Sequence, residues 1–438
     1  MRCAFVFRRD LRLYDNTGLM LAGEECNEVI PIFFLDPRQV EDNPYLSPRA
    51  LEFMLQSLEN LDEELQDLGS RLHVVKAIPE ALIGKIQVEA VYLNYDYTPF
   101  SRARDEGMKE ALRAKGKKLI SSEDLLLTGR DFFEREGPFT VFTHFYRRAK
   151  ALKVREPKDE LPRNLGVMES LPGVEVLKGL RRQEILFKGG RKEALKILER
   201  AKSINYEQRD HPYLDQTTHL SPYIKFGVLS IREVFHNLDR EDLRRQLYWR
   251  DFYTLLAHYN PQVFRGPFKR EYYCVRWEND PVKLEAWKEG RTGYPIVDAG
   301  MRELKSTGYI NGRVRLLVSS FLVKILHVDW RIGERYFATQ LVDYDPSVNN
   351  GNWQWVASTG VDYMFRVFNP WLQQRKFDPE AKYVKKWVEE LREQRPEIIH
   401  EIYNHEVKGY PRPIVDYTEE VAKSREEYRR AREECSNF

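Results

Sequence analysis

Short apolar runs alternate with amphipathic segments in the first part of the chain. Residues 51–65 carry leucine or methionine at three- and four-residue spacing, which predicts a helix. Ser47 followed by Pro48 would cap the start of that helix, and a second amphipathic helix is expected at residues 103–114. Strands that alternate with helices predict a doubly wound parallel sheet, which binds ligands at the carboxyl ends of its strands. The apolar runs expected to form these strands are residues 3–7, 29–35, 72–75, 90–94 and 118–120.

The periodic pattern weakens from residue 125 to residue 188, where pairs such as Gly137-Pro138 interrupt the chain. A connection of this length is unusual inside one compact domain and acceptable between two. We therefore predict an α/β domain over residues 1–124, a connector over residues 125–188 and a larger all-α domain over residues 189–438. Helices of the last part are expected at residues 191–202, 230–238, 242–257, 281–288, 297–306, 314–326, 330–341 and 379–391, with a charged helix over 418–438.

Composition excludes several classes of protein. With 42% hydrophobic residues among 438, the chain can bury a large core and is not a disordered protein. It has no run of 18 apolar residues and its first residues lack the order of a signal peptide, so we expect a cytoplasmic protein without membrane contact.

The cysteines lie far apart, without zinc-type spacing, and are expected to be structural thiols rather than a disulfide framework. They are Cys3, Cys26, Cys274 and Cys435.

The charge balance is nearly even. The 70 basic and 68 acidic residues leave a net charge of only +2. The overall charge therefore does not indicate a nucleic-acid partner. Attraction to DNA would have to come from basic residues gathered on one face.

The stretch 343–368 gathers short polar side chains just ahead of two tryptophans. Trp353 and Trp355 are separated by one residue, so their indoles point in different directions. Pro346 and Gly351 are expected to interrupt any helix there. Indoles beside polar groups suit a flat aromatic ligand with hydrogen-bonded edges and stacked faces, whereas a polar loop capped by core aromatics is the alternative. The polar residues are Asp343, Asp345, Asn349 and Asn350.

This stretch also resembles the signature of the photolyase and cryptochrome flavoproteins, with the sequence D-Y-D-P-S-V-N-N-G-N-W-Q-W-V-A-S-T-G. Other segments resemble further motifs of that family, occur in the family's order and extend the similarity over nearly the whole chain. The pattern is most similar to that of microbial (class I) cyclobutane pyrimidine dimer photolyases. The further segments are R-R-D-L-R from Arg8, T-T-H-L-S-P-Y-I-K-F-G from Thr217, T-G-Y-P-I-V-D-A-G-M-R-E-L from Thr292 and R-V-R-L-L-V-S-S-F-L-V-K from Arg313.

The resemblance implies a monomeric deoxyribodipyrimidine photo-lyase. Its helical domain would hold FAD non-covalently, and photoexcited reduced FAD would repair cyclobutane pyrimidine dimers in DNA by electron transfer. Arg315 and Asp343 would flank the isoalloxazine ring as a charged pair, Asn349 would face its N5 atom, and His219 stands where related proteins often have Arg. The residues implied in FAD binding are Tyr206, Thr217, Thr218, His219, Leu220, Ser221, Gln246, Arg250, Arg315, Asp343, Asp345 and Asn349.

Two further groups of residues follow from the resemblance. Trp353, Trp330 and Trp277 would form an electron relay from the flavin to the surface, although core packing alone also explains buried tryptophans. Indole walls would receive a flipped lesion, and arginines would grip the flanking phosphates. The residues implied in lesion or DNA binding are Gln246, Trp249, Arg313, Leu316, Trp355 and Arg366.

The chain departs from the dimer-photolyase pattern near the lesion. Gln246 stands where Glu is usual, so hydrogen bonding survives but no proton can be donated. Gln at this position also occurs in cryptochromes and in (6-4) photolyases. The latter use two His where this chain has Gly312 and Leu316, which argues against (6-4) repair. A cryptochrome without repair activity and a DASH-type single-strand photolyase remain alternatives, as does, without the resemblance, an α/β nucleotide-binding enzyme with a helical partner domain.

A second, antenna chromophore is implied for the α/β domain. Around residues 95–104 the chain departs from folate-binding members, which have Glu where Ser101 stands. A deazaflavin or a second flavin is therefore expected rather than a folate. No metal site is expected.

Overall fold

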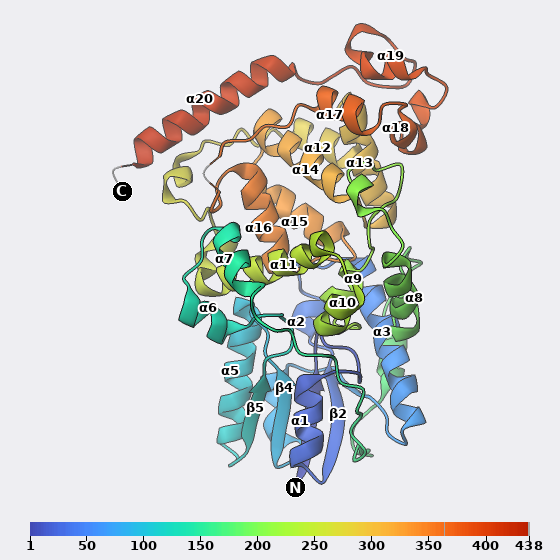
Figure 1. Ribbon diagram of the computed structural model, residues 1–438, viewed down its shortest axis with the longest axis vertical. Helices are drawn as coiled ribbons and strands as arrows, with labels where there is room; N and C mark the ends of the chain where they lie inside the picture. The colour runs from blue at the N-terminus through green and yellow to red at the C-terminus, as the bar shows by residue number, and fades with distance from the viewer. Residues whose placement is uncertain (363, 437–438) are drawn as a thin grey trace. The chain divides into compact units, whose positions relative to one another are not determined.

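The computed structural model describes residues 1–362 and 364–436, shown as a ribbon in Figure 1. The chain folds into two compact units, each of which is assembled from segments that are distant in sequence. Each unit is described by itself, and the three-part division at residues 124 and 188 stays a prediction. Unit 1 comprises Met1–Ser203, Thr218–Tyr259 and Val342–Ser347, and unit 2 comprises Ile204–Thr217, Asn260–Leu341 and Val348–Phe438.

Unit 1 is built on a five-stranded parallel sheet with the order β3-β2-β1-β4-β5. All five predicted strands are confirmed, with ends that differ by at most two residues. Strand order reverses at β1, which pairs with both β2 and β4, so a crevice opens at the carboxyl ends of β1 and β4. The strands are β1 (Arg2–Phe7), β2 (Glu28–Phe34), β3 (His73–Val75), β4 (Ala90–Asn94) and β5 (Lys118–Ser122).

Helices cover both faces of this sheet, which explains why its strands read as unbroken apolar runs (Figure 1). Ala4 and Val6 of β1 belong to a buried cluster with Met108 and Leu112 of helix α5. The intervening Phe5 points to the opposite face and is also fully buried. The predicted doubly wound α/β architecture is therefore confirmed.

The helices of unit 1 begin where capping residues stand. Ser47 accepts a hydrogen bond from the backbone N–H of Ala50 at 3.2 Å, which confirms the predicted N-cap of α3. Pro48 follows as the first helical residue, where its missing N–H costs nothing. The helices are α1 (Thr17–Glu25), α2 (Pro37–Val40), α3 (Pro48–Asp67), α4 (Pro79–Leu82), α5 (Pro99–Arg113), α6 (Arg130–Glu136), α7 (Phe142–Ala149), α8 (Arg191–Ala201), α9 (Ser221–Lys225), α10 (Ile231–Asn237) and α11 (Glu241–Tyr259).

Unit 2 is helical in its described part, and helix α16 links it to unit 1. We expected Pro346 and Gly351 to interrupt this stretch, and that prediction was wrong. Pro346 is the first residue of α16, a position that tolerates proline, and Gly351 lies inside the helix. The helices are α12 (Pro281–Glu289), α13 (Pro295–Thr307), α14 (Gly312–Ser320), α15 (Trp330–Gln340), α16 (Pro346–Ala357), α17 (Pro370–Phe377), α18 (Lys382–Trp387), α19 (Pro396–His400) and α20 (Tyr417–Cys435).

Two of the predicted helices are divided in the structure. The helix predicted at residues 314–326 is α14 followed by a π-helical turn, η6 (Phe321–Ile325). The helix predicted at residues 379–391 is divided into α18 and the short 3₁₀ turn η7 (Glu389–Leu391). The remaining predicted helices are present with shifted ends, and residues 437–438 of the predicted charged helix lie outside the described residues.

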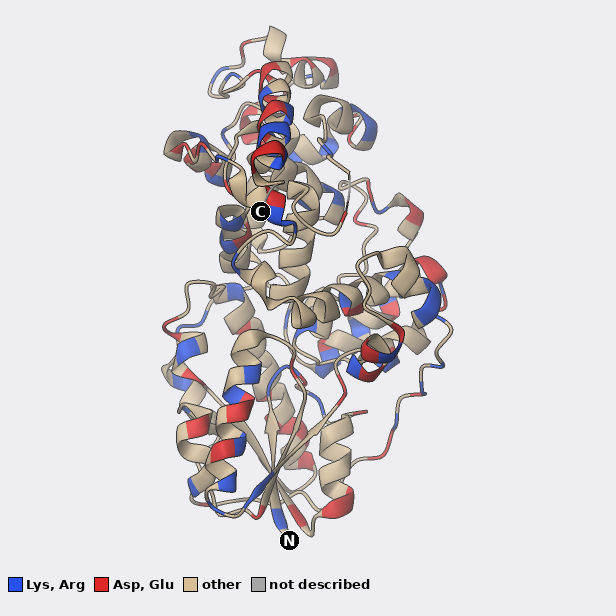
Figure 2. Ribbon diagram, turned by 90° about the vertical axis from the view of Figure 1, so that its left-hand side faces the viewer, with Lys and Arg blue, Asp and Glu red and all other residues tan. Residues whose placement is uncertain are grey.

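Charged residues of both signs are interspersed along the helices (Figure 2). On α20 Arg429 pairs with Glu426 and Glu433 within two turns. None of the helices in the described part of the chain has the length and apolar character that crossing a bilayer requires.

The four cysteines form two disulfides, so the prediction of free structural thiols was wrong. Cys3 in β1 pairs with Cys26 at the end of α1, with Cα atoms 6.2 Å apart. Cys274 pairs with Cys435 of α20, with Cα atoms 6.0 Å apart. Both Cα separations suit a disulfide. Sequence separations of 23 and 161 residues hid these pairings, because only the fold brings the partners together.

We predict that Cys26→Ser lowers the free energy of unfolding by about 3 kcal/mol, because the Cys3–Cys26 disulfide closes a short loop of the unfolded chain. Urea unfolding under non-reducing conditions measures this difference, which should vanish when both proteins are reduced. In urea without reductant, the wild-type protein should titrate no thiols. Titration of four thiols there would contradict the pairing.

Candidate functional site

Asp345 lies among three cationic side chains of unit 1. Arg9 donates from Nη2 to Asp345 Oδ2 at 2.5 Å, and Arg9 Nη1 lies 3.7 Å from Asp96. Burial alone would raise the pKa of Asp345, but Arg9, Lys225 and Arg250 hold it well below its usual range. Burial and Arg9 lower the pKa of Lys225 to about 8. The predicted site residues Asp345 and Arg250 thus belong to one charged cluster.

The predicted phosphate-binding turn precedes helix α9 in unit 1. Ser221 is the first residue of α9 and donates from its hydroxyl to Asp343 Oδ2 at 2.6 Å. His219 has a φ of +57°, which turns the backbone immediately before the helix, and Leu220 is buried. The structure therefore connects two predicted FAD-binding segments, around residues 218–221 and 343–345, through one hydrogen bond.

The predicted FAD-binding residues divide between the units. Arg315 and Asp343 lie in different units, so their pairing as a charged couple stays a prediction. Arg315 donates from Nε to the carbonyl oxygen of Ile310 at 2.9 Å within unit 2. Those in unit 1 are Thr218, His219, Leu220, Ser221, Gln246, Arg250, Asp343 and Asp345, and those in unit 2 are Tyr206, Thr217, Arg315 and Asn349.

Glu334 of α15 supports the asparagine pair of α16 in unit 2. Asn349 donates from Nδ2 to the backbone oxygen of Glu334 at 3.1 Å, and Asn350 donates to Glu334 Oε1 at 3.3 Å. Burial raises the pKa of Glu334 to about 8, so its carboxyl is protonated at neutral pH. Sequence analysis missed Glu334 because it stands between charged residues typical of a solvent-facing helix.

The two inner members of the predicted tryptophan relay lie on facing helices of unit 2. Trp330 on α15 and Trp353 on α16 are 1% and 2% exposed. Gly333 lies one turn after Trp330, and a methyl group there would overlap the Trp353 ring and Leu322. Because residues three apart share one helix face, the Trp353 ring packs against the face of α15 that carries Trp330.

Trp277, the outer member, is only partly buried. The next residue, Glu278, donates its backbone N–H to the carbonyl oxygen of His327 at 3.0 Å. His327 stands three residues before Trp330 in the sequence, so this hydrogen bond brings the two tryptophan-bearing segments together. The Trp277 ring meets Tyr428 of α20 edge to face, with centroids 6.3 Å apart. The described part of unit 2 thus holds all three relay candidates, ordered from buried to partly exposed.

Four of the six predicted lesion- or DNA-binding residues line one open cavity of about 510 Å³ in unit 2. The Arg366 guanidinium lies over the Trp355 ring at 4.7 Å and pairs with Asp362 at 2.6 Å. Arg313 pairs with Asp210 at 2.9 Å. The predicted residues lining the cavity are Arg313, Leu316, Trp355 and Arg366, and those that sequence analysis missed are Phe365, Val367, Phe368, Tyr417 and Arg425.

The other two predicted lesion-binding residues lie on α11 in unit 1. Gln246 is exposed, and Trp249 follows one turn later. The Trp249 indole stacks on Phe142 with centroids 3.6 Å apart and an interplanar angle of 8°. Phe142 was not anticipated, because it belongs to the weakly patterned segment between residues 125 and 188. The structure therefore joins Gln246 and Trp249 on one helix, and their approach to the residues of unit 2 stays a prediction.

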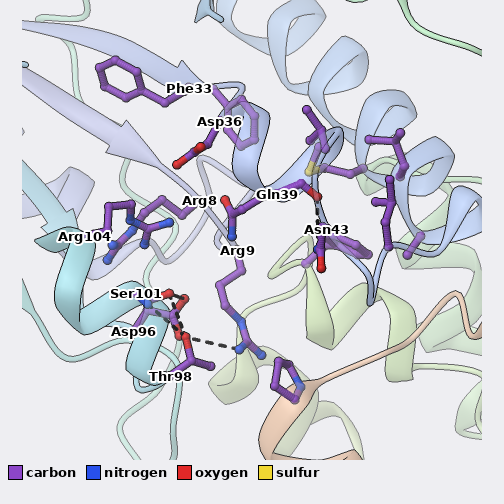
Figure 3. A pocket seen from close by; sticks show the side chains of 18 of the residues that line it. Arg8, Arg9, Phe33, Asp36, Gln39, Asn43, Asp96, Thr98, Ser101 and Arg104 are labelled. Carbon is purple, nitrogen blue, oxygen red and sulfur yellow. Dashed lines mark hydrogen bonds and ion pairs between the residues drawn. The ribbon is translucent and has the colours of Figure 1, made fainter. Parts of the chain in front are cut away.

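A cavity of about 220 Å³ opens at the carboxyl ends of the strands of unit 1 (Figure 3). Arg8 and Arg9 come from the end of β1, and Asp96 follows β4. Phe33 of β2 and Met108 of α5 contribute apolar surface. This is the switch point at which the sheet order was expected to place a ligand.

Polar groups in this cavity are only partly satisfied. Ser101 donates to Asp96 Oδ2 at 2.8 Å. Burial would raise the pKa of Asp96, but the positive charges of Arg9, Arg8 and Arg104 lower it to about 2. Within the described residues, Arg104 Nη2 and Arg9 Nε are buried without a hydrogen-bond acceptor. Two unsatisfied donors favour a ligand rich in acceptor oxygens or nitrogens.

Comparison with known proteins gives consistent matches. Residues 3–163 match the family described as DNA photolyase, and residues 243–430 match the FAD binding domain of DNA photolyase. A relative from Halobacterium salinarum, named deoxyribodipyrimidine photo-lyase, is 34% identical over 95% of this chain and 96% of its own length.

Solved structures are similar over nearly the whole chain. A crystal structure of an archaeal photolyase from Sulfolobus tokodaii, described as holding two FAD molecules, is 52% identical with a TM-score of 0.95 and covers 98% of this chain and 100% of its own. A cryptochrome from a Synechocystis species is 27% identical with a TM-score of 0.85 and covers 97% of this chain and 98% of its own.

We predict that Gly333→Ala lowers the free energy of unfolding by about 1–3 kcal/mol, because the added methyl group overpacks the contact between α15 and Trp353. Gly312→Ala is the matched control, since no atom lies within 4 Å of a methyl group at that position. It should leave stability unchanged or raise it by up to about 1 kcal/mol. Equal urea midpoints for the two variants would contradict the described packing of Trp353.

Proposed function

Because the chain belongs to the DNA photolyase family, we propose that it splits cyclobutane pyrimidine dimers in DNA under light. The observation that carries this proposal is the cavity of unit 2, which combines the Trp355 indole with the guanidinium groups of Arg313 and Arg366. A flipped dimer offers ring surfaces that a flat indole can pack against, and its flanking phosphates can be bound by arginine. The cavity therefore suits a lesion extruded from the duplex.

The residues around this cavity would have two different roles, stacking on the lesion and binding of the DNA backbone. Trp355 would replace stacking that the lesion has lost, which favours damaged over intact DNA. Arg313 and Arg366 would bind phosphates and so supply affinity that does not depend on sequence. Both arginines already pair with carboxylates, which holds their side chains in place before DNA arrives.

The chain's residues fit FAD as the catalytic cofactor. Ser221 and Asp343 are joined by a hydrogen bond, and the neutral amide of Asn349 is oriented by the backbone of Glu334. We propose that Ser221 and the preceding turn hold the pyrophosphate, and that the Asn349 amide meets N5 as donor or acceptor. When bound, reduced FAD would supply the photochemistry, which is transfer of an electron to the dimer under light and its return after the dimer splits.

The second candidate function is a cryptochrome-type photoreceptor, and one residue favours it. Gln246 occupies the position where dimer photolyases usually carry Glu, and it is exposed on α11. Its amide can donate and accept hydrogen bonds but cannot supply a proton. A protein that signals without repair would tolerate this substitution, whereas a repair enzyme should gain from its reversal.

The test is loss of thymine dimers from duplex and single-stranded DNA, measured with the pre-reduced holoprotein under blue light and in darkness. We expect light-dependent repair of both substrates. Gln246→Glu should raise the repair rate by no more than about tenfold, the value of one improved hydrogen bond. Repair of neither substrate would refute the proposal and favour the cryptochrome, and repair of single strands alone would indicate the DASH type.

We further propose that the cavity of unit 1 holds the ring of a second flavin as antenna. Its unsatisfied arginine donors, Arg104 Nη2 and Arg9 Nε, suit the carbonyl and ring-nitrogen acceptors of that ring. The volume of about 220 Å³ lies below the usual range of about 300–1,000 Å³ for ligand pockets, so only part of a dinucleotide would be enclosed. The Sulfolobus tokodaii photolyase, with its two FAD molecules, supports a flavin.

We predict that Arg104→Met lowers the bound flavin from two molecules per chain to one, because the most buried arginine of this cavity is removed. Arg102→Met is the matched control, since Arg102 is exposed on the same helix and does not line the cavity. Flavin released by denaturation is counted by absorbance and identified by chromatography. Two flavins in the Arg104 variant, or a deazaflavin in the wild-type protein, would contradict the assignment.

A further inference from the structure

Helix α20 forms one wall of the cavity in unit 2. Tyr417, its first residue, and Arg425, two turns later, both line the cavity beside Arg366 and Trp355. Eight residues of helix place these two side chains about 12 Å apart along the axis. The C-terminal helix therefore extends the aromatic and basic lining beyond the residues that resemble the family's lesion-binding set.

The basic residues of α20 differ in their partners. Lys423, Arg429 and Arg430 each pair with a glutamate of the same helix. Within the described residues, Arg425 and Arg432 form no ion pair with a carboxylate. Of these two, Arg425 is the one that lines the cavity, and its side chain is exposed.

Arg425 also differs from the two other arginines of the cavity. Arg313 is held by Asp210 at 2.9 Å, and Arg366 is held by Asp362 at 2.6 Å. A phosphate that approaches either of them must compete with a carboxylate, whereas a phosphate that approaches Arg425 meets a guanidinium without such a competitor among the described residues. Arginine can bind phosphate through two parallel hydrogen bonds.

The position of Arg425 on α20 keeps it clear of the structural contacts of that helix. Val421 and Tyr428 form the buried side of α20, and Tyr428 donates to the carbonyl oxygen of Ala357 at 2.7 Å. Lys423 and Glu420 pair on the flank opposite to Arg425. Substitution of Arg425 should therefore leave the packing of the helix intact.

We propose that Arg425 of α20 binds a backbone phosphate of the damaged strand, as a third cationic contact beside Arg313 and Arg366. The inference rests on the proposed function, because it takes DNA to be the ligand of this cavity. Tyr417 would border the same strand with its ring. A phosphate contact of this kind carries no sequence information, so it should act on damaged and intact DNA alike.

The test compares Arg425→Gln with Lys423→Gln, which removes one positive charge from the same helix on its opposite flank. Binding of the FAD-loaded protein is measured in darkness over a range of salt concentrations. The probes are a duplex with a single thymine dimer and the same duplex without damage. Arg425→Gln should weaken binding of both duplexes several-fold and reduce the slope of log K against log salt by about 0.9. Arg425→Lys should retain the wild-type slope, and Lys423→Gln should bind like the wild type.

The outcomes separate this inference from the proposed function. An unchanged slope in Arg425→Gln, or an equal loss in Lys423→Gln, overturns the contact while the wild-type preference for the dimer stands. A wild-type protein that binds both duplexes equally contradicts the lesion-binding proposal, yet the slope on intact DNA still decides whether Arg425 meets a phosphate. A wild-type protein that binds neither duplex overturns both. Unchanged thermal melting and flavin content show that each variant is folded.

Discussion

The ion pair between Arg9 and Asp345 is the interaction on which the assembly of unit 1 depends. It joins residues 336 positions apart in sequence, and both side chains are largely buried. Such a pair is costly to break, because both charges would stay buried with weaker compensation, Arg9 from Asp96 alone and Asp345 from Lys225 and Arg250. It fixes the segment Val342–Ser347 against the end of β1. That segment then presents Asp343 to Ser221 and Tyr344 to the cavity at the strand ends.

Charge pairing also shapes the cavity of unit 2, but there the pairs are weaker. The side chains of Arg313 and Asp210 are 21% and 29% exposed, and partly exposed ion pairs contribute little to stability. A phosphate can therefore replace the carboxylate at small cost. The ion pair therefore orients the arginine side chain and still leaves its guanidinium accessible to a DNA phosphate. Arg425, on the C-terminal helix, adds a guanidinium that needs no such exchange.

Features of the fold and the site could be predicted where neighbouring residues in the sequence determine them, and were missed where distant residues do. The strands were predicted closely, because parallel strands buried on both faces are continuous apolar runs. The cavity residues Arg313 and Trp355 came from resemblance, whereas Arg425 belongs to a helix whose many charges look like an ordinary solvated surface. Helix α16 was missed because Pro346, its first residue, was interpreted as a turn residue. The disulfide pairs and the support of Asn349 by Glu334 depend on contacts that sequence spacing does not carry.

The central claim is that this chain uses light absorbed by bound flavin to split pyrimidine dimers. Its most direct test is the action spectrum of dimer splitting by the pre-reduced holoprotein, measured at equal photon flux across the near-ultraviolet and blue range. The account predicts a rate that follows the absorption of reduced FAD, with an added band from the second chromophore. Dimer loss that is independent of wavelength, or absent at every wavelength, would contradict it.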